Sequence, residues 1–306
     1  MVKTIGNVIL ESPEIDWISK KDLYHENEIC DDSVSLDELE ELSLKDPYQV
    51  LMNNSKWPIL YHFSPIRHSL LEWYDFDKEA SLLEIGADCG ALTGLFCDKV
   101  KKVTGIDTSY KRLLINATRN SKYDNLYLKA CNIYDFESEE KYDYITLIGV
   151  FEYSDYIFDD NFADLKWLQK LKTMLTPQGK LIIALRNKYG LKYFAGAPDE
   201  YTGEMYGSIF GNNTKASGYT YEKIKNLINK AGYKSSYFYY PVPDYRMPNE
   251  IFSDDYLPVS GQVHGMRTNF DYERYDYFNE DTMINTICKD DMFQHFANSY
   301  LVVCDK

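Results

Sequence analysis

The stretch LLEIGADCGALTG, residues 82–94, decides the fold of this chain. It begins with apolar residues, places Glu84 two positions before Gly86, and continues into a segment with helical character. A buried strand, a glycine turn and a helix in this order predict the start of a doubly wound sheet, in which ligands bind at the carboxyl ends of the strands. The NAD fingerprint needs glycines at 86, 88 and 91, but the chain has Asp88 and Ala91. The loop therefore does not favour NAD.

From residue 81 onward, short apolar runs alternate with amphipathic runs of helical period. We expect strands at 81–85, 102–107, 125–130, 142–149, 179–185 (after a turn, TPQG), 235–240 and 297–304. We expect helices at 90–100, 109–120, 162–175 and 219–232, with Ser109 and Thr220 as N-caps and Gly232 closing the last helix. This order predicts an α/β fold with a Rossmann-like, doubly wound sheet of seven strands, whose last strand returns to the sheet edge.

Three further regions flank or interrupt this pattern. Residues 1–56 are acidic and weakly periodic, and we expect an N-terminal helical cap with a short solvated helix. Residues 57–306 form the main domain, which opens with a helical stripe of Ile66, Leu70, Leu71 and Tyr74. Insertions at about 186–218 and 241–295 are too long for plain connections, and we expect them to cover a substrate.

The composition argues against several classes of partner. The chain has 306 residues and a net charge of -15, from 33 basic and 48 acidic side chains, which disfavours nucleic acid. No apolar run is long enough for a membrane span and no secretion signal is recognisable, so we expect a cytoplasmic protein without membrane insertion. The six cysteines lack disulfide or metal-ligand spacing, and no two histidines lie four residues apart, so we expect free thiols and no metal site.

Polar side chains follow the predicted strands one after another. Glu84 ends the first strand, and Gly86 and Gly90 follow it as an acid-x-Gly-x-x-x-Gly pattern. Asp107 ends the second strand, where a carboxylate can accept hydrogen bonds from both hydroxyls of a ribose. Asn132 follows the third strand, placed to bond the edge of an adenine, and the adjacent Ile133 can pack on the ring. These strand ends together predict a site for an adenosyl ligand.

The same residues resemble the class I S-adenosylmethionine-dependent methyltransferases, over about residues 57–306. The resemblance implies S-adenosylmethionine as the cofactor, with Glu84 orienting the ammonium group of its methionine part. The cofactor-binding residues that it implies are Glu84, Gly86, Ala87, Gly90, Asp107, Thr108, Asn132, Ile133 and Gly149. Within this superfamily, segments such as GADCGALTGLF and RNKYGLKYFAGAPDEYTG resemble a bacterial group associated with glycosyltransferases and cell-surface polysaccharide assembly.

The chain departs from the family pattern at Asp88, where glycine is usual. A carboxylate there adds bulk beside the anionic methionine tail, and we expect it to weaken cofactor binding. Asn132 stands where an acid is common, and its amide still offers an acceptor oxygen.

A hydroxyl acceptor would require a base to remove its proton. His62, which precedes the first strand, is one candidate, and Asp199 and Glu200 in the insertion at 186–218 are the others. For each of them, an ordinary structural role in a helix interface or a solvated loop is the alternative. Further residues of this insertion are candidates to hold a polar substrate: Asn187, Tyr193 and Tyr201.

The sequence thus predicts methyl transfer to a small-molecule or saccharide acceptor, by in-line attack of a hydroxyl group on the sulfonium methyl. A glycosyltransferase is a candidate partner. Two alternatives stay open. One is another adenosyl-ligand transferase, such as an aminopropyl transferase. The other is a cofactor-binding protein without catalysis that assists a glycosyltransferase.

Overall fold

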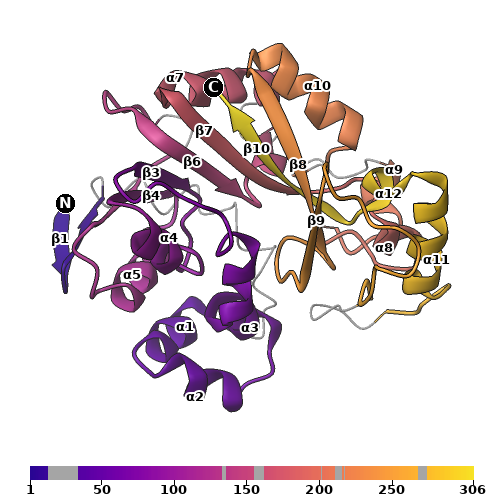
Figure 1. The fold of residues 1–306 in the computed structure, drawn as a ribbon. Helices are drawn as coiled ribbons and strands as arrows, with labels where there is room; N and C mark the ends of the chain where they lie inside the picture. The colour runs from indigo at the N-terminus through magenta and orange to yellow at the C-terminus, as the bar shows by residue number, and fades with distance from the viewer. Residues whose placement is uncertain are drawn as a thin grey trace. The chain divides into compact units, whose positions relative to one another are not determined.

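The computed structural model describes residues 1–12, 34–132, 136–154, 162–200, 202–210, 216, 218–267 and 274–306. The chain divides into two compact units, Met1–Thr146 and Leu147–Lys306, which we describe separately (Figure 1). This boundary lies within a strand and does not coincide with the division expected at residue 56.

The first unit contains a mostly parallel sheet with the strand order β1-β2-β5-β4-β3-β6. Its strands are β1 (Val2–Ile5), β2 (Val8–Glu11), β3 (Ser81–Ile85), β4 (Lys102–Asp107), β5 (Leu126–Ala130) and β6 (Tyr142–Ile148), which crosses the unit boundary. β3 pairs in parallel with β4, and β4 with β5, so Ile85 lies opposite Ile106 and Asp107 opposite Ala130. The carboxyl ends of β3, β4 and β5 therefore meet at one edge.

The helices of the first unit follow the predicted order, with changes at their ends. They are α1 (Leu36–Ser43), α2 (Pro47–Met52), α3 (Trp57–Phe63), the 3-10 helix η3 (Pro65–Leu70), α4 (Thr93–Lys99) and α5 (Tyr110–Arg119). Ser109 caps α5 as predicted, because its side chain accepts a hydrogen bond from the Arg112 backbone. α4 begins three residues later than predicted, because Gly90 has a φ of 80° and its left-handed turn must finish first.

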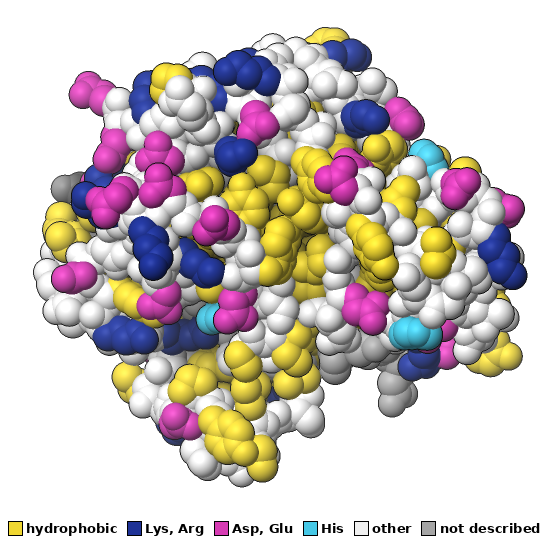
Figure 2. All heavy atoms as spheres, in the orientation of Figure 1, with side chains coloured by type: hydrophobic (Ala, Val, Ile, Leu, Met, Phe, Trp, Pro, Cys, Tyr) yellow, Lys and Arg dark blue, Asp and Glu magenta, His cyan; other side chains and the backbone are white. Residues whose placement is uncertain are grey.

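The N-terminal segment differs from the expected cap in two ways. β1 and β2 form an antiparallel hairpin, and β2 pairs in parallel with β5, so residues 1–12 contribute to the sheet. α1 buries Leu39 and Leu42 in a cluster shared with α3, α5 and the loop after β3. Leu44, Tyr48 and Met52, at the end formed by α1 and α2, are exposed. Figure 2 shows hydrophobic side chains on the surface of this region.

The continuous helical stripe expected within residues 57–76 is wrong. The helix breaks between α3 and η3 because Ser64 precedes Pro65, and a residue before proline avoids the helical conformation. Leu70 and Leu71 are fully buried, as a stripe would require, but Ile66 is 41% exposed.

The second unit has the strand order β7-β10-β8-β9. Its strands are β7 (Leu175–Arg186), β8 (Ser235–Val242), β9 (Glu250–Ser253) and β10 (Ser299–Asp305). β10 pairs antiparallel with both β7 and β8, so the prediction that the last strand lies at the sheet edge is wrong. The expected turn TPQG also falls within β7.

All seven predicted strands are present, and the described residues contain ten strands in total. The three additional strands are β1, β2 and β9, each only four residues long. Four residues carry too little alternation of apolar and polar side chains to be recognised from the sequence. The seven-strand count is therefore too low.

The helices of the second unit are η4 (Phe151–Tyr153), α7 (Ala163–Met174), α8 (Leu191–Phe194), α9 (Gly207–Phe210), α10 (Tyr221–Ala231), α11 (Glu280–Ile287), η5 (Cys288–Asp290) and α12 (Phe293–Phe296). The insertions at about 186–218 and 241–295, which the sequence left irregular, contain the short helices α8, α9, α11, η5 and α12. In the described ranges we find no helix that combines the length and the hydropathy of a membrane span. The cysteines in these ranges are free thiols, and Cys30 lies outside them.

The caps of α10 provide a test of the local folding argument. The Thr220 side chain accepts a hydrogen bond from the Lys223 backbone at 3.2 Å, and Gly232 ends the helix in a left-handed conformation. We expect Thr220→Ala to lower the free energy of unfolding by about 1 kcal/mol, measured by denaturant titration, because one backbone donor loses its partner. Thr220→Ser keeps the hydroxyl group and should retain most of the stability; an equal loss in both variants would contradict the capping role.

Candidate functional site

The loop after β3 is held against the end of β4 by backbone hydrogen bonds. The backbone N–H groups of Gly86 and Ala87 both donate to the carbonyl of Ile106, at 2.9 and 3.0 Å. Gly86, Asp88 and Gly90 have φ angles of 78°, 44° and 80°, so the loop passes through three left-handed positions. Glycine suits the first and last of these, and Asp88 occupies a conformation that few side chains adopt.

The Asp107 carboxylate accepts hydrogen bonds from this loop and from the residue that caps α5. Its Oδ2 accepts from the backbone N–H of Asp88 at 3.0 Å, and its Oδ1 accepts from that of Ser109 at 2.9 Å. The residue is fully buried. Its carboxylate thus joins the loop to the start of α5, and each oxygen retains a second lone pair.

The charge of Asp88 is balanced by Arg112 from α5. Arg112 Nη1 lies 2.6 Å from Asp88 Oδ1, with the two side chains 3% and 15% exposed. Asn116, one turn further along α5, donates to the carbonyl oxygens of Ala87 and Asp88 at 3.1 and 3.3 Å. The sequence led us to expect that this carboxylate weakens cofactor binding. The structure places Arg112, 24 residues later in the chain, against it as a countercharge.

Gly90 allows the loop backbone to pack closely against the side chain of Asn116. A Cβ at Gly90 would lie 2.6 Å from Asn116 Oδ1, which is closer than real contacts allow. Gly90 is therefore needed for packing of the loop against α5.

Glu84 is a buried acid in a short hydrogen-bond chain. Thr93 Oγ1 donates to Glu84 Oε2 at 2.7 Å, and Asn116 Nδ2 donates to Thr93 Oγ1 at 2.9 Å. Burial raises the pKa of Glu84 to about 8, with smaller upward contributions from Asp107 and Asp88, whereas the bond from Thr93 lowers it. The acid is consequently protonated at neutral pH until a cation approaches it.

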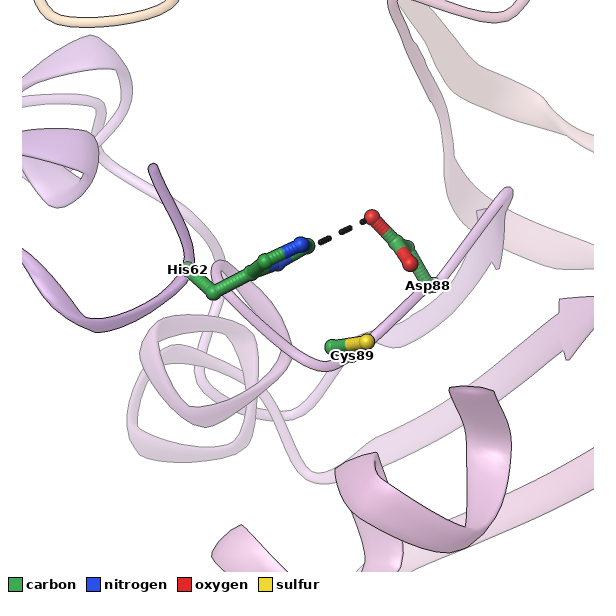
Figure 3. Close-up of side chains that lie close together, drawn as sticks. All are labelled: His62, Asp88 and Cys89. Carbon is green, nitrogen blue, oxygen red and sulfur yellow. Dashed lines mark ion pairs between the residues drawn. The ribbon is translucent and has the colours of Figure 1, made fainter. Parts of the chain in front are cut away.

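His62 lies on α3, next to the same loop (Figure 3). Its Nδ1 is 3.8 Å from Asp88 Oδ2, and its side chain is 1% exposed. Burial lowers the pKa of His62 to about 4, although Asp88 opposes this shift, so the ring is neutral. A ring this deeply buried favours the structural role over the role of a base, the two alternatives that the sequence left open for His62.

The other predicted cofactor residues lie at successive strand ends. Thr108 and Asn132 follow β4 and β5 and are half-buried. Ile133 lies outside the described residues. Gly149 follows β6 in the second unit with a φ of 72°, and a Cβ there would meet Tyr245 Oη at 2.6 Å.

The second unit has its own buried polar cluster at the carboxyl end of β7. Glu152 in η4 accepts hydrogen bonds from the Arg186 backbone and from Arg186 Nε and Nη2, the latter two at 3.1 and 3.3 Å. Arg186 Nη1 also lies 3.5 Å from Glu200 Oε2. These side chains are nearly fully buried, so for Glu200 the alternative of a solvated loop residue does not apply.

Glu200 links this cluster to α8. It accepts from Lys192 Nζ at 2.5 Å and from Tyr193 Oη at 2.7 Å. Burial alone would raise the pKa of Glu200, but Lys192 and Arg186 outweigh it and hold the pKa at about 2. Lys192 Nζ also lies 3.5 Å from Asp244, which pairs with Arg246 at 2.6 Å. A carboxylate with so low a pKa is a weak base, and the geometry favours a positioning role for Glu200.

Asp199 and Asn187 also have structural partners. Asp199 accepts from the Thr202 backbone at 2.8 Å, from Thr202 Oγ1 at 3.0 Å and from Ser208 Oγ, which folds the segment back on itself. Asn187 donates to the carbonyl oxygens of Ala297 and His295 at 2.7 and 2.8 Å. Tyr201 lies outside the described residues.

The structure also brings together a group that spacing rules missed. One ligand-type atom from each of His62, Asp88 and Cys89 lies within 4.8 Å of the others. His62 is 26 positions before Asp88, so no short motif connects them. The sequence offered two separate signals: a histidine in the segment before the first predicted strand, and an unusual acid in the loop after that strand.

Comparison with known proteins agrees with this geometry. Residues 83–181 match the family model described as a methyltransferase domain. Among curated proteins, none matches the sequence.

Similar solved structures include three methyltransferases. Phosphoethanolamine N-methyltransferase 1 from Haemonchus contortus, in complex with phosphoethanolamine and S-adenosylhomocysteine, has a TM-score of 0.50 and 12% identity, over 89% of this chain and 50% of its own length. N-methyltransferase NodS from Bradyrhizobium japonicum WM9, in complex with S-adenosylhomocysteine, has a TM-score of 0.44 and 15% identity, over 89% and 97%. A SAM-dependent methyltransferase from Archaeoglobus fulgidus has a TM-score of 0.48 and 12% identity, over 79% and 93%.

The Haemonchus protein shares the fold, and this chain spans half of its length. The assignment of activity rests on the family match, which begins inside β3 and extends into β7. Residues 83–181 form a methyltransferase domain, and the protein is a methyltransferase whose cofactor is S-adenosylmethionine.

Proposed function

We propose that the protein transfers the methyl group of S-adenosylmethionine to a hydroxyl group of a small polar acceptor, and that the acceptor is a saccharide. The observation that carries this proposal is the polar network at the carboxyl ends of β3 and β4, where Glu84, the loop at 86–90 and Asp107 are joined. In doubly wound sheets, ligands bind at this edge. The cofactor supplies an electrophilic methyl group on its sulfonium, and the protein aligns the acceptor with it.

Glu84 fits the ammonium group of the cofactor's methionine part. It is a buried carboxyl group that its surroundings hold protonated, and an approaching cation would stabilise its ionised form. Asp107 and Thr108 are our proposed ribose contacts, and Asn132 and Ile133 the proposed adenine contacts. The loop residues Gly86, Ala87 and Gly90 complete the proposed cofactor contacts of the first unit. Gly149, in the second unit, is a proposed contact on the resemblance alone.

Asp88 does not oppose cofactor binding in this proposal. Arg112 lies 2.6 Å from its carboxylate and is itself buried, so the pair is close to neutral as seen by an anionic tail. The left-handed conformation that glycine usually provides is maintained by hydrogen bonds to both backbone groups of Asp88, from Asn116 and to Asp107.

The acceptor, in our proposal, binds at the polar cluster of the second unit. Arg186, Tyr193, Lys192 and Glu200 are buried and paired with one another at the end of β7, so the cluster fixes the polar end of this strand beside which the acceptor is proposed to bind. Glu200 acts there as a positioning residue for Lys192 and Tyr193. The resemblance to the bacterial group linked to polysaccharide assembly supports a saccharide, and a glycosyltransferase is a proposed partner on the same ground.

The direct test is a product assay with S-adenosylmethionine and a panel of saccharides, with amines as the comparison class. We expect S-adenosylhomocysteine to form only when a hydroxyl acceptor is present, together with a methyl ether detected by mass spectrometry. Methylthioadenosine as the product would indicate an aminopropyl transferase instead. Methylation of amines alone would contradict the hydroxyl proposal.

Cofactor binding should release a proton from Glu84. Below its pKa of about 8 the acid is protonated, and it must ionise to pair with an ammonium group that is already charged. At about pH 6.5 we expect calorimetric titration in two buffers of different ionisation enthalpy to show release of close to one proton per cofactor. Glu84→Gln should abolish this release, and Glu79→Gln, at an exposed acid, should retain it. Absence of proton release in the unmodified protein would contradict the proposed contact.

The pair of Asp88 and Arg112 can be tested by a double-mutant cycle. Asp88→Asn keeps the side-chain shape and tolerates a positive φ, but leaves a buried guanidinium without its countercharge. We expect Asp88→Asn and Arg112→Met each to lower the free energy of unfolding by about 2 kcal/mol. The double variant should lose at least about 1 kcal/mol less than the sum of the two. Strict additivity would show that the pair does not hold the loop.

Glu200 should contribute stability that depends on pH. Because its pKa is lowered to about 2, its stabilising contribution is fully present above the ordinary glutamate pKa and is lost as the pH falls towards 2. We expect Glu200→Gln to lower the free energy of unfolding by about 3 kcal/mol at neutral pH, because Lys192 and Arg186 lose a buried partner. The difference should shrink between about pH 4 and pH 2. The control is Glu204→Gln, an exposed acid of the same segment, and an equal effect there would contradict the role of the cluster.

A further inference from the structure

His62 is a buried histidine whose ring makes no hydrogen bond in the described part of the chain. Both Nδ1 and Nε2 are shielded from solvent without a hydrogen-bonding partner, and the side chain is 1% exposed. A buried polar group left in this state costs about 1–3 kcal/mol. Such groups are rare in folded proteins, and a bound ion is one of the few physical reasons for them.

Two further side chains of ligand type converge on this ring. Asp88 and Cys89 come from the loop after β3, and Figure 3 shows the imidazole directed at the Asp88 carboxylate with the Cys89 side chain beside it. The three ligand-type atoms lie within 4.8 Å of one another, and Nδ1 is 3.8 Å from Asp88 Oδ2. Zinc bonds of about 2.0–2.3 Å in a tetrahedron separate ligand atoms by roughly 3.3–3.7 Å, so small side-chain shifts suffice to close the site.

The surrounding residues hold the three groups as outer-shell partners hold metal ligands. Arg112 binds Oδ1 of Asp88, which orients Oδ2 towards His62. Arg119 donates to the backbone carbonyls of both Cys89 and His62, at 2.5 and 2.6 Å, and so ties the two chain segments together. The bond from Arg112 to the Asp88 carboxylate is of the kind that fixes ligand orientation in metal sites.

We propose that His62, Asp88 and Cys89 form a binding site for a zinc ion. Imidazole and thiolate ligands select zinc over the hard cations magnesium and calcium, which prefer oxygen. Binding replaces the thiol proton of Cys89, which leaves to the solvent, and a solvent molecule completes the tetrahedron. The thiolate and the carboxylate balance the charge of the ion, and Arg112 and Arg119 remain outside the first shell.

A bound ion would hold the loop that we propose for the cofactor. Two of the three ligands are adjacent residues of that loop, and the third is on α3. The ion would therefore fasten the left-handed turn at Asp88 to the N-terminal helices. This inference does not depend on the acceptor or on catalysis.

The test uses cobalt as a spectroscopic probe, followed by zinc. The full-length protein is treated with a chelator, which is then removed, and titrated with Co²⁺ under reducing conditions. We expect one equivalent to produce the charge-transfer absorption of a cobalt–thiolate bond, and Zn²⁺ to displace it. Zinc should also raise the unfolding temperature in proportion to occupancy.

Two variants identify the ligands, and one serves as the control. Cys89→Ser and His62→Gln should lose the absorption band and the zinc-dependent rise in unfolding temperature. Cys97→Ser, at a cysteine of α4 that is also buried but lies outside the cluster, should keep both. The proposal is overturned if the unmodified protein shows no cobalt–thiolate band, or if the band survives Cys89→Ser. The first outcome needs no variant to fold, so the test remains decisive if a substitution unfolds the chain.

Discussion

The ion pair between Asp88 and Arg112 is the interaction on which the first unit depends. It allows an acid to occupy a left-handed position in a loop where glycine would be conformationally easier. Because Arg112 is on α5 and Asp107 joins the same loop to the start of α5, loop and helix are held as one piece. The loop at the carboxyl end of β3 is therefore preformed without a ligand.

The buried cluster of the second unit uses charge differently. Glu152, Arg186, Glu200 and Lys192 alternate in sign, so each ion has a partner of opposite charge and burial is tolerated. Such a cluster rarely gives more stability than apolar packing would, but it fixes the direction of each donor and acceptor. That property suits the binding of a polar molecule by several directed hydrogen bonds.

Much of the fold was predictable because its signals are local. The seven strands, the caps Ser109 and Thr220, and the closing Gly232 each depend on residues within one element or turn. The order of strands near the C-terminus was not predictable, because the position of β10 between β7 and β8 is decided by pairing between distant segments. The four-residue strands β1, β2 and β9 were not recognised for a different reason, since four residues carry too little alternation of apolar and polar side chains.

The candidate site, like the fold, has a part that local sequence predicts and a part that depends on distant residues. Glu84, Gly86 and Asp107 could be assigned because each stands at a strand end that the sequence pattern marks. Two partners that decide the chemistry of this loop are distant in sequence: Arg112 neutralises Asp88, and Asn116 hydrogen-bonds Thr93, the donor to Glu84. An acid that looked like a defect in the loop pattern thus has a partner in α5, and its second oxygen faces His62. The residue that departs from the family pattern is the one through which the loop connects to the rest of the first unit, so the departure is better explained as a gain of contacts than as a loss of glycine.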